Sequence, residues 1–302
     1  MTLNQTDPKP IIAVGIQQTC SSDKQTSFEN TKQWIAKATQ ENADLIVLQE
    51  LHATQYFCQT EETRFFDLAE PLDGPTAQFL SEQAKLANAV IVGSIFERRA
   101  AGIYHNTALV FDRDGSLAGF YRKMHIPDDP GFYEKYYFTP GDDPGFEPIQ
   151  TSIGKLGVMV CWDQWYPEGA RLMALKGAEI LIYPTAIGWD PADTTDEQVR
   201  QKDAWIGVQR GHSIANNLPV IAINRVGHET DPSNQSQGIN FWGHSFITGP
   251  QGEFLDIAEH QNETLVKAHI QLKQIESVRR VWPYFRDRRI DAYDGLNKRY
   301  LD

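Results

Sequence analysis

Short apolar runs alternate with segments of helical spacing along most of the 302-residue chain. The runs at 11–16 (IIAVGI) and 45–48 (LIVL) carry no charged residue, which indicates buried strands. Segment 28–40 instead repeats apolar residues at helical spacing. The pattern predicts strands at 11–16, 45–48, 90–96, 104–112, 117–123, 178–184, 219–224, 240–247, 253–257 and 264–270, and helices at 28–40, 71–88, 170–175 and 196–216.

Two tight turns predict hairpins. Residues 113–116 (RDGS) join 104–112 to 117–123, and a second hairpin over 153–160 turns around Gly154 and Lys155. A strand, a helix and a hairpin therefore occur in each half of the chain. This order suits two sheets covered by helices on their outer faces, so we predict an α/β fold with four layers, an α-β-β-α sandwich. No Pro/Gly/Ser-rich linker interrupts the chain, and we expect one domain over 1–302.

The segment 124–148 (MHIPDDPGFYEKYYFTPGDDPGFEP) is too long for an idle connection in a compact domain. Its many Tyr and Phe residues favour an ordered loop, and we expect it to pack near the functional site.

Composition excludes several classes of function. The net charge of −12 argues against a general affinity for nucleic acid or anionic membrane, and mildly favours cationic small molecules as partners. No apolar run approaches the roughly 20 residues of a membrane helix, and the polar N-terminus lacks a signal core. Three cysteines without a C-x-x-C pair suggest neither a disulfide framework nor a zinc site, so we expect a reducing cytoplasm.

Cys161 is a candidate nucleophile. It lies in 156–171 (LGVMVCWDQWYPEGAR), where an apolar strand turns into a helix. Backbone N–H groups and the positive end of a helix lower the pKa of a thiol held at such an elbow. On position alone, a small buried core residue remains an open alternative. His105 and His125 could suggest a Cys–His dyad, but neither is needed when a carboxylate is the base, and we take them as pocket or structural residues.

Two further strand ends carry reactive groups. Glu50 follows LIVLQ and Lys123 follows GFYR, just as Cys161 follows VMV. Such side chains often only reach water, but strand ends are also where α/β folds build their sites. A cysteine hydrolase of amides needs a base for the thiol, a positive donor for the oxyanion and an acid for the leaving amine. These three residues supply that chemistry.

In this order and in these contexts, the three residues resemble those of the nitrilase superfamily of carbon–nitrogen hydrolases, over nearly the whole chain. The segments YRKMHIPDDPGFYEKYYFTPGD, CWDQWYPEGARLMALKGAEIL, YPTAIGW and YFRDRR resemble the members that act on N-carbamoylputrescine. The resemblance implies the nitrilase-type sandwich and no cofactor or metal. It makes Glu50 the base and then the acid, places Lys123 and the backbone N–H of Trp162 at the oxyanion, and adds Glu134 as a second glutamate.

The resemblance also implies a substrate. N-carbamoylputrescine would be converted to putrescine, carbon dioxide and ammonia through a thiol-bound carbamoyl intermediate. The acid of a T-A-I-G-x-E-P segment would meet its distal ammonium, but Asp190 stands there, one methylene shorter, and leaves the length of the substrate open. His125, Trp189 and Tyr56 are the other implied substrate-binding residues.

Other functions remain open at this point. An N-carbamoyl amino acid, a β-ureido acid or an ω-amide would share the chemistry, but a substrate carboxylate would want an Arg or Lys in the distal pocket. A non-catalytic binding protein on the same fold is the alternative from another class.

The C-terminal arm, residues 271–302, is basic and aromatic. Interleaved acids and the negative net charge make nucleic-acid binding the weaker reading. The resemblance implies subunit contacts through this arm, and hence a homodimer or a larger homo-oligomer. Its basic residues include Arg279, Arg280, Arg286, Arg288, Arg289 and Lys298.

Overall fold

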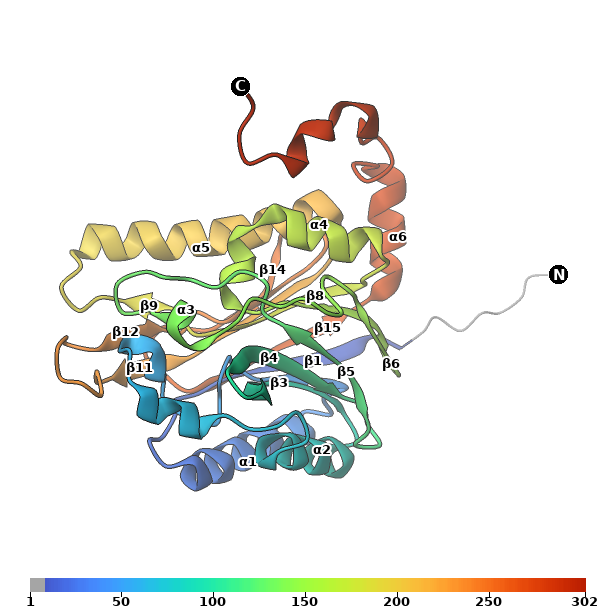
Figure 1. Cartoon of the computed structure of the whole chain (residues 1–302). Helices are drawn as coiled ribbons and strands as arrows, with labels where there is room; N and C mark the ends of the chain where they lie inside the picture. The colour runs from blue at the N-terminus through green and yellow to red at the C-terminus, as the bar shows by residue number, and fades with distance from the viewer. Residues whose placement is uncertain (1–8) are drawn as a thin grey trace.

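Two six-stranded sheets stack on each other in the structure, a computed structural model that describes residues 9–302 (Figure 1). The first sheet has the order β15-β1-β2-β3-β4-β5 and the second the order β14-β13-β10-β8-β7-β6. The strands of the first sheet are β1 (Ile11–Gln17), β2 (Leu45–Val47), β3 (Val90–Ala100), β4 (Ile103–Phe111), β5 (Leu117–Arg122) and β15 (Thr264–Ile270). Those of the second are β6 (Ile149–Thr151), β7 (Gly154–Val158), β8 (Ile180–Thr185), β10 (Val220–Asn224), β13 (Phe246–Thr248) and β14 (Phe254–Ile257).

Helices form the two outer layers (Figure 1). α1 (Lys24–Gln40) and α2 (Pro75–Ala87) cover the first sheet, and α4 (Pro167–Leu175) and α5 (Thr195–Asn216) cover the second. The predicted four-layer α-β-β-α sandwich is therefore confirmed. The remaining helices are α3 (Glu134–Tyr137), α6 (Leu272–Val281) and 3-10 helices at Phe57–Gln59, Thr63–Leu68, Cys161–Trp165, Ile290–Ala292 and Asp294–Asn297.

The apolar runs lack alternation because both faces of each sheet are covered. In β1, Ile11 and Ala13 join the cluster between the sheets, whereas Ile12 and Val14 join the cluster beneath α1 and α2. Both faces therefore require apolar side chains. At Gly15 the two sheets approach closely, because a Cβ there would collide with the side chain of Ile223 in β10.

The strand predicted at 240–247 is wrong as one element. It divides into β12 (Ile239–Trp242) and β13, which belong to different sheets, because Gly243 and His244 both have positive φ, 57° and 52°. The small sheet that holds β12 has the order β11-β12-β9 and was not predicted. Its other strands are β9 (Gly188–Trp189) and β11 (Val226–Glu229).

Two boundaries also differ from the prediction. The first helix begins at Lys24 rather than Phe28, because the Asp23 carboxylate accepts a hydrogen bond from Thr26 N at 2.7 Å and caps it. The second hairpin turns at residues 152–153, between β6 and β7, ahead of Gly154. Most of the polar N-terminal stretch considered for a signal, residues 1–8, lies outside the described part of the chain. Within residues 9–302, no helix combines the length and apolar character needed to span a membrane.

Candidate active site

Four chain segments each contribute one polar side chain to a cluster between the two sheets. Glu50 lies in the turn after β2, Lys123 directly follows β5, and Cys161 opens the 3-10 helix that follows β7. Glu134 is the first residue of α3 within the long loop 124–148. Lys123 Nζ lies 2.8 Å from Glu50 Oε1 and 2.6 Å from Glu134 Oε2. The loop therefore packs at this site, as its aromatic content predicted.

The Lys123 ammonium is fully buried between the two glutamates. Burial lowers its pKa, but Glu134 and Glu50 raise it by more, and the result lies well above the usual value. For Glu134, burial raises the pKa to about 7, although Lys123 acts in the opposite direction. Its Oε1 atom accepts a hydrogen bond from the Tyr56 hydroxyl at 2.7 Å. Two of the three ammonium N–H bonds are thus engaged, and one remains for another acceptor.

The two oxygens of Glu50 differ. Oε1 accepts hydrogen bonds from Lys123 and from Asn106 Nδ2, the latter at 2.6 Å. Oε2 is buried and has no hydrogen-bond partner within residues 9–302. A buried carboxylate oxygen without a donor is ready to accept a proton.

Cys161 sits in a strained turn that Asp163 holds. Its φ of 41° is rare for a residue with a Cβ. Asp163 Oδ2 accepts hydrogen bonds from Val160 N and from the Tyr121 hydroxyl, each at 2.9 Å. The thiol reaches the carbonyl of Ala186 at 3.9 Å. The 3-10 helix therefore presents the sulfur toward the end of β8.

The expectation of a lowered thiol pKa is wrong for this resting site. Burial and the negative charge of Glu50 raise the pKa of Cys161 well above its usual value, and Lys123 offsets only part of the effect. The helix at Cys161 is a short 3-10 turn, and α4 starts only at Pro167. The thiol is consequently neutral at rest and needs a base to react.

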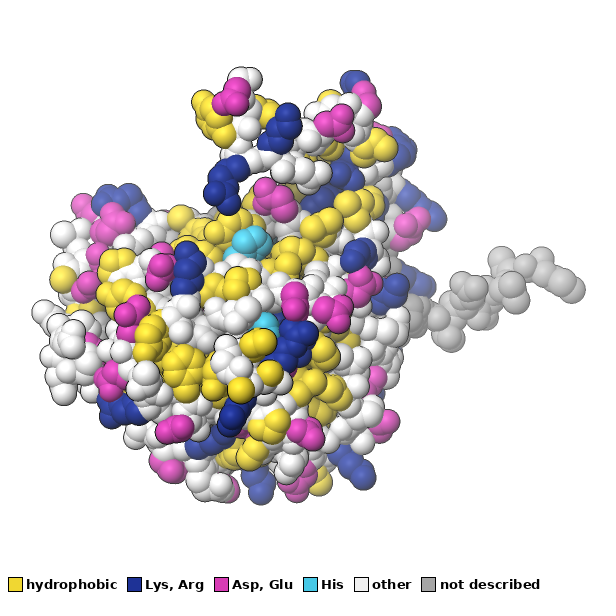
Figure 2. Space-filling model, viewed as in Figure 1, with side chains coloured by type: hydrophobic (Ala, Val, Ile, Leu, Met, Phe, Trp, Pro, Cys, Tyr) yellow, Lys and Arg dark blue, Asp and Glu magenta, His cyan; other side chains and the backbone are white. Residues whose placement is uncertain are grey.

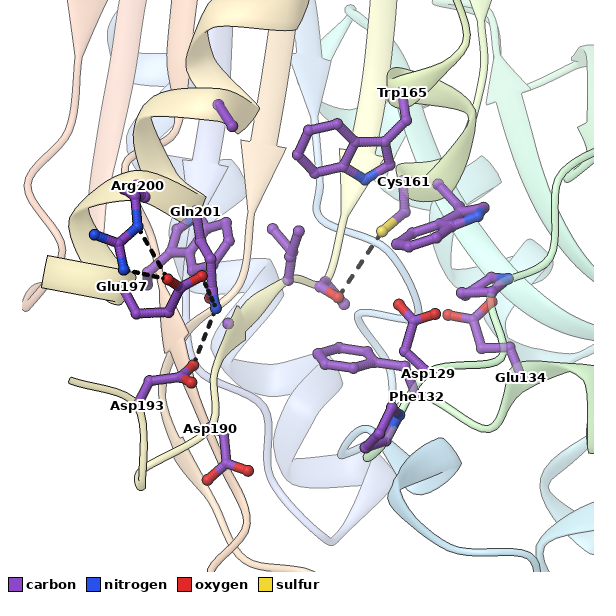
Figure 3. Close-up of a pocket in the computed structure, with 18 residues that line it drawn as sticks. Asp129, Phe132, Glu134, Cys161, Trp165, Asp190, Asp193, Glu197, Arg200 and Gln201 are labelled. Carbon is purple, nitrogen blue, oxygen red and sulfur yellow. Dashed lines mark hydrogen bonds and ion pairs between the residues drawn. The ribbon is translucent and has the colours of Figure 1, made fainter. Parts of the chain in front are cut away.

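A cavity of about 640 Å³ opens above Cys161 and Glu134 (Figure 3). In the close-up, the Asp129 carboxylate points into this cavity on the side of Cys161, next to the Phe132 ring. Asp129 is half-buried, and burial raises its pKa. The lining consists of Pro127, Asp129, Pro130, Phe132, Glu134, Cys161, Trp162, Trp165, Ala186, Ile187, Gly188, Asp190, Asp193, Glu197, Arg200, Gln201, Ala204 and Trp242.

The outer rim of the cavity is acidic. The lining includes Asp190, Asp193 and Glu197, and Arg200 is the one basic residue among the described lining residues. Arg200 donates two hydrogen bonds to Glu197, at 3.0 and 2.6 Å, so its charge is matched locally. Asp190 is exposed, its Oδ1 accepts a hydrogen bond from Ala192 N at 2.8 Å, and in Figure 3 its carboxylate points away from Cys161.

Three residues expected to bind substrate lie outside the cavity lining. The indole N–H of Trp189 donates to Gln198 O at 3.0 Å, which ties the rim to α5. His125 Nδ1 lies 2.8 Å from Asp163, and its ring stacks on Tyr166. Tyr56 is buried behind Glu134. The side chains of Trp189, His125 and Tyr56 thus contact other residues around the cavity and do not line it.

Several site residues were missed in the sequence. Asn106 lies in β4 within the buried polar run His105-Asn106-Thr107, and buried polar residues in a strand are a signal of function. Arg225 donates hydrogen bonds to the carbonyl oxygens of Glu50 and Leu51, and it directly follows the apolar strand β10, the same signal that identified Glu50. Asp129 had no such signal, because its place depends on how the long loop folds. Within the described residues, no group of three or more His, Cys, Asp and Glu side chains is arranged to hold a metal ion.

Known proteins resemble this chain over most of its length. The model of the carbon–nitrogen hydrolase family matches residues 11–280. A tomato (Solanum lycopersicum) protein named N-carbamoylputrescine amidase is 42% identical over 288 residues, which cover 95% of this chain and 94% of that protein. A citrullinase from Francisella tularensis is 39% identical, with 96% and 99% covered. The crystal structure of a carbon–nitrogen hydrolase from Helicobacter pylori G27 superimposes with a TM-score of 0.94 at 54% identity, and covers 96% of this chain and 99% of that one.

Proposed function

The chain belongs to the carbon–nitrogen hydrolase family, and from this premise we propose that it hydrolyses N-carbamoylputrescine to putrescine, carbon dioxide and ammonia. As a member, it is a hydrolase of carbon–nitrogen bonds. One observation carries the finer proposal: Cys161 and Glu134 line a cavity whose charged lining is mostly acidic. Glu134 is joined through Lys123 to Glu50, and we call these four residues the floor of the site.

In the proposed first step, Glu50 takes the proton of the Cys161 thiol while the sulfur attacks the ureido carbon. The free Oε2 atom of Glu50 suits this role. The oxyanion that forms is stabilised by the remaining Lys123 N–H and by the backbone N–H of Trp162. Glu50 then returns the proton to the departing nitrogen, which leaves a carbamoyl group on sulfur.

Water completes the reaction. Glu50 removes a proton from a water molecule that attacks the thiocarbamate carbon, and the thiol leaves and is reprotonated. The released carbamic acid separates into carbon dioxide and the second amine. One water is consumed for each substrate, and the atoms balance as putrescine, carbon dioxide and ammonia. Throughout the reaction, Glu134 keeps Lys123 oriented and partly balances the positive charge of its ammonium.

Charge supports a cationic substrate. The described lining contains five acidic residues and one Arg, and that Arg is paired with Glu197. A substrate ammonium lowers its free energy beside the half-buried Asp129 and the rim acids, whereas a free carboxylate would be repelled. Because Asp190 is exposed and already bonded to Ala192 N, we assign the larger share of this role to Asp129.

A ureido amino acid such as citrulline is the second candidate, because Arg200 lines the cavity and the citrullinase of Francisella tularensis is a relative. A substrate panel separates the two. We expect the highest kcat/KM for N-carbamoylputrescine, followed by neutral N-butylurea, and lower values for citrulline and N-carbamoyl-β-alanine, as measured by ammonia release. A kcat/KM for citrulline about tenfold above that for the amine would overturn the proposal in favour of the second candidate.

We also propose that residues 271–302 form a subunit-contact arm of the 1–302 domain in a cytoplasmic homo-oligomer. In Figure 1 the segment after α6 stands off the sandwich beyond α4 and α5. Residues 281–302 expose large apolar side chains, some of them visible in yellow at the top of Figure 2, which in a lone subunit would face water. Light scattering on the purified chain tests this proposal, and a monomer at micromolar concentration would contradict it. The exposed side chains are Val281, Trp282, Tyr284, Ile290, Tyr293, Leu296, Tyr300 and Leu301.

A further inference from the structure

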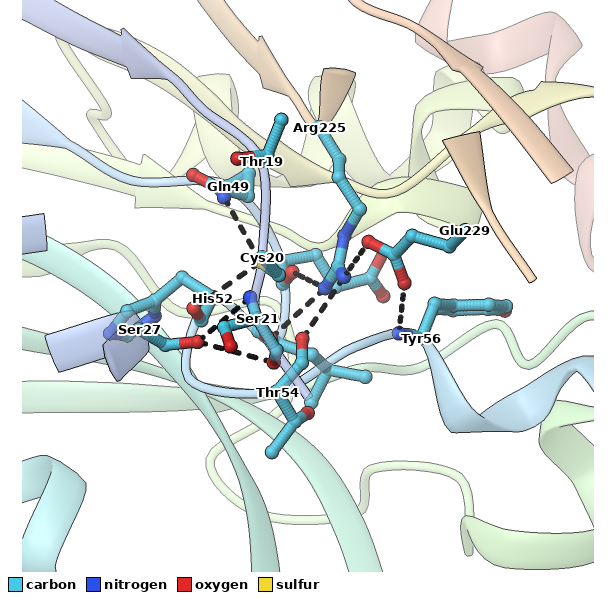
Figure 4. A network of polar contacts seen from close by, with 12 residues as sticks. Thr19, Cys20, Ser21, Ser27, Gln49, His52, Thr54, Tyr56, Arg225 and Glu229 are labelled. Carbon is cyan, nitrogen blue, oxygen red and sulfur yellow. Dashed lines mark hydrogen bonds and ion pairs between the residues drawn. The ribbon is translucent and has the colours of Figure 1, made fainter. Parts of the chain in front are cut away.

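A second buried ion pair lies behind the catalytic cluster. Arg225 and Glu229 are joined at 2.6 Å, and their side chains are 0% and 3% exposed (Figure 4). Arg225 directly follows β10 of the second sheet, and Glu229 is the last residue of β11 in the small sheet. A buried ion pair adds little stability over well-packed apolar residues, because desolvation opposes the attraction. This pair therefore invites a functional explanation.

The guanidinium of Arg225 holds the turn that carries the catalytic base. Nη2 donates to the carbonyl oxygens of Glu50 and Leu51, both at 3.0 Å. Nη1 donates to Thr54 O at 3.0 Å. This turn is strained, because Leu51 has a φ of 49°. A planar donor with several N–H groups reaches all three carbonyls together, which a lysine could not do.

Glu229 extends the contact to the other glutamate. Its Oε2 atom accepts a hydrogen bond from Tyr56 N at 2.6 Å, and the Tyr56 hydroxyl donates to Glu134 Oε1 at 2.7 Å. Glu134 binds Lys123, and Lys123 binds Glu50. The contacts thus form a closed ring. It runs from Arg225 through Glu229, Tyr56, Glu134 and Lys123 to Glu50, whose carbonyl oxygen accepts a hydrogen bond from Arg225.

We propose that Arg225 and Glu229 are positioning residues for the hydrolysis. Through the backbone of Glu50 and through Tyr56, they fix the separation of the two glutamates on either side of Lys123. This inference rests on the proposed function, since it presumes that Glu50 and Glu134 serve catalysis. It assigns the pair a role in the reaction in addition to any role in folding.

The test uses Glu229→Gln, which keeps the shape of the side chain and removes its charge. Glu97→Gln is the matched control: Glu97 is 2% exposed and paired with Arg122 at 2.6 Å, but within residues 9–302 it has no hydrogen bond to Glu50, Lys123 or Glu134. We expect kcat to fall about 10- to 100-fold in Glu229→Gln with KM nearly unchanged, and to stay within about threefold in Glu97→Gln. Thermal unfolding of both variants compares their loss of stability.

The pH profile gives a readout that a purely structural role would not move. A displaced Tyr56 would donate less to Glu134, so the pKa of that carboxyl would rise and the acidic limb of kcat/KM would move to higher pH. Glu97→Gln should leave this limb in place. The charged and titratable groups that interact with Glu134 are Lys123, Glu50, Tyr56, Cys58 and Cys161.

A double-mutant cycle completes the experiment. If the pair acts on Glu134 through Tyr56, the kcat losses in Glu229→Gln and Tyr56→Phe should be less than additive. Equal losses of kcat in Glu229→Gln and Glu97→Gln, an unmoved acidic limb or strict additivity would overturn the inference. If Glu229→Gln does not fold, Arg225→Lys takes its place with the same expectations. Because each variant is measured on the best substrate of the wild type, a wrong substrate assignment would not affect the outcome.

Discussion

The floor and the rim of the cavity are built in different ways. At the floor, Glu50, Lys123 and Glu134 are fully buried, come from separate segments and hold one another at hydrogen-bond distance. At the rim, Asp190, Asp193 and Glu197 are more exposed, and their carboxylates accept hydrogen bonds from donors close by in the sequence, namely Ala192 N, Gln201 and Arg200. The difference teaches that the chemistry depends on fixed distances, whereas substrate choice depends on charge that solvent partly screens.

The largest effect is expected at the floor. Cys161→Ala should abolish turnover and leave the free energy of unfolding almost unchanged, because the thiol contributes chemistry more than packing. Iodoacetamide should label Cys161 ahead of Cys20 and Cys58, since Cys161 lines the cavity and Cys58 is buried in a separate cluster. Mass spectrometry of the labelled peptides checks this order. Turnover that survives in Cys161→Ala would end the assignment of the nucleophile.

A smaller and selective effect is expected at the rim. Asp129→Asn keeps the shape of the side chain but removes its charge, and kcat/KM for N-carbamoylputrescine should fall by about 1 to 3 kcal/mol in transition-state terms. Asp190→Asn is the matched variant at an exposed position, and its loss should stay below about threefold. Neutral N-butylurea should be almost unaffected in both.

Either of two results would contradict this division between the carboxylates. Equal losses on the charged and the neutral substrate would indicate a distorted rim, and a larger loss in Asp190→Asn would return the ammonium to the position that the resemblance implied.

Glu134 at the floor should also affect how the free energy of unfolding depends on pH. Burial raises the pKa of Glu134 from its ordinary 4.5 to about 7, so the folded state binds this proton more tightly than the unfolded state. The contribution to stability is full below about pH 4.5 and is lost as the pH rises through 7. Relative to Glu134→Gln, the free energy of unfolding of the wild type should therefore decline between these values in urea titrations. A flat difference would mean that Glu134 is ionised throughout.

Removal of metal ions is expected to have no effect on activity. Exhaustive treatment with EDTA should leave kcat unchanged, because the proposed mechanism takes its base, its oxyanion donors and its nucleophile from side chains and backbone. A loss of activity that a divalent cation restores would refute this mechanism at the floor and at the rim alike.

The sequence indicated the floor better than the rim for a physical reason. Glu50, Lys123 and Cys161 follow apolar strands, and the packing of buried strands fixes where their ends lie. Asp129 lies in a loop whose path depends on many aromatic contacts that no local pattern encodes. Trp189 and His125 were expected at the substrate, but their polar atoms bind Gln198 and Asp163 instead. Side-chain direction at such positions is decided by tertiary contacts.

In the fold, too, buried strands were predicted well, whereas features that depend on tertiary structure were not. Strands buried on both faces, such as β1 and β8, were predicted closely from their apolar runs. The break at Gly243 and His244 was missed, because the strand-like pattern on either side continues across it. The pKa of Cys161 was predicted in the wrong direction, since sequence shows the neighbouring helix but not the depth of burial.

The positive φ angles at Cys161 and Leu51 have a consequence for protein engineering. A side chain in this backbone region costs about 1 to 2 kcal/mol, a cost that glycine does not incur. A search for thermostable variants that scores only the fold would therefore favour glycine at the nucleophile and next to the base. These two positions should be held constant in any such library, because the substitutions that relax the backbone there would remove the thiol at one position and loosen the turn of Glu50 at the other.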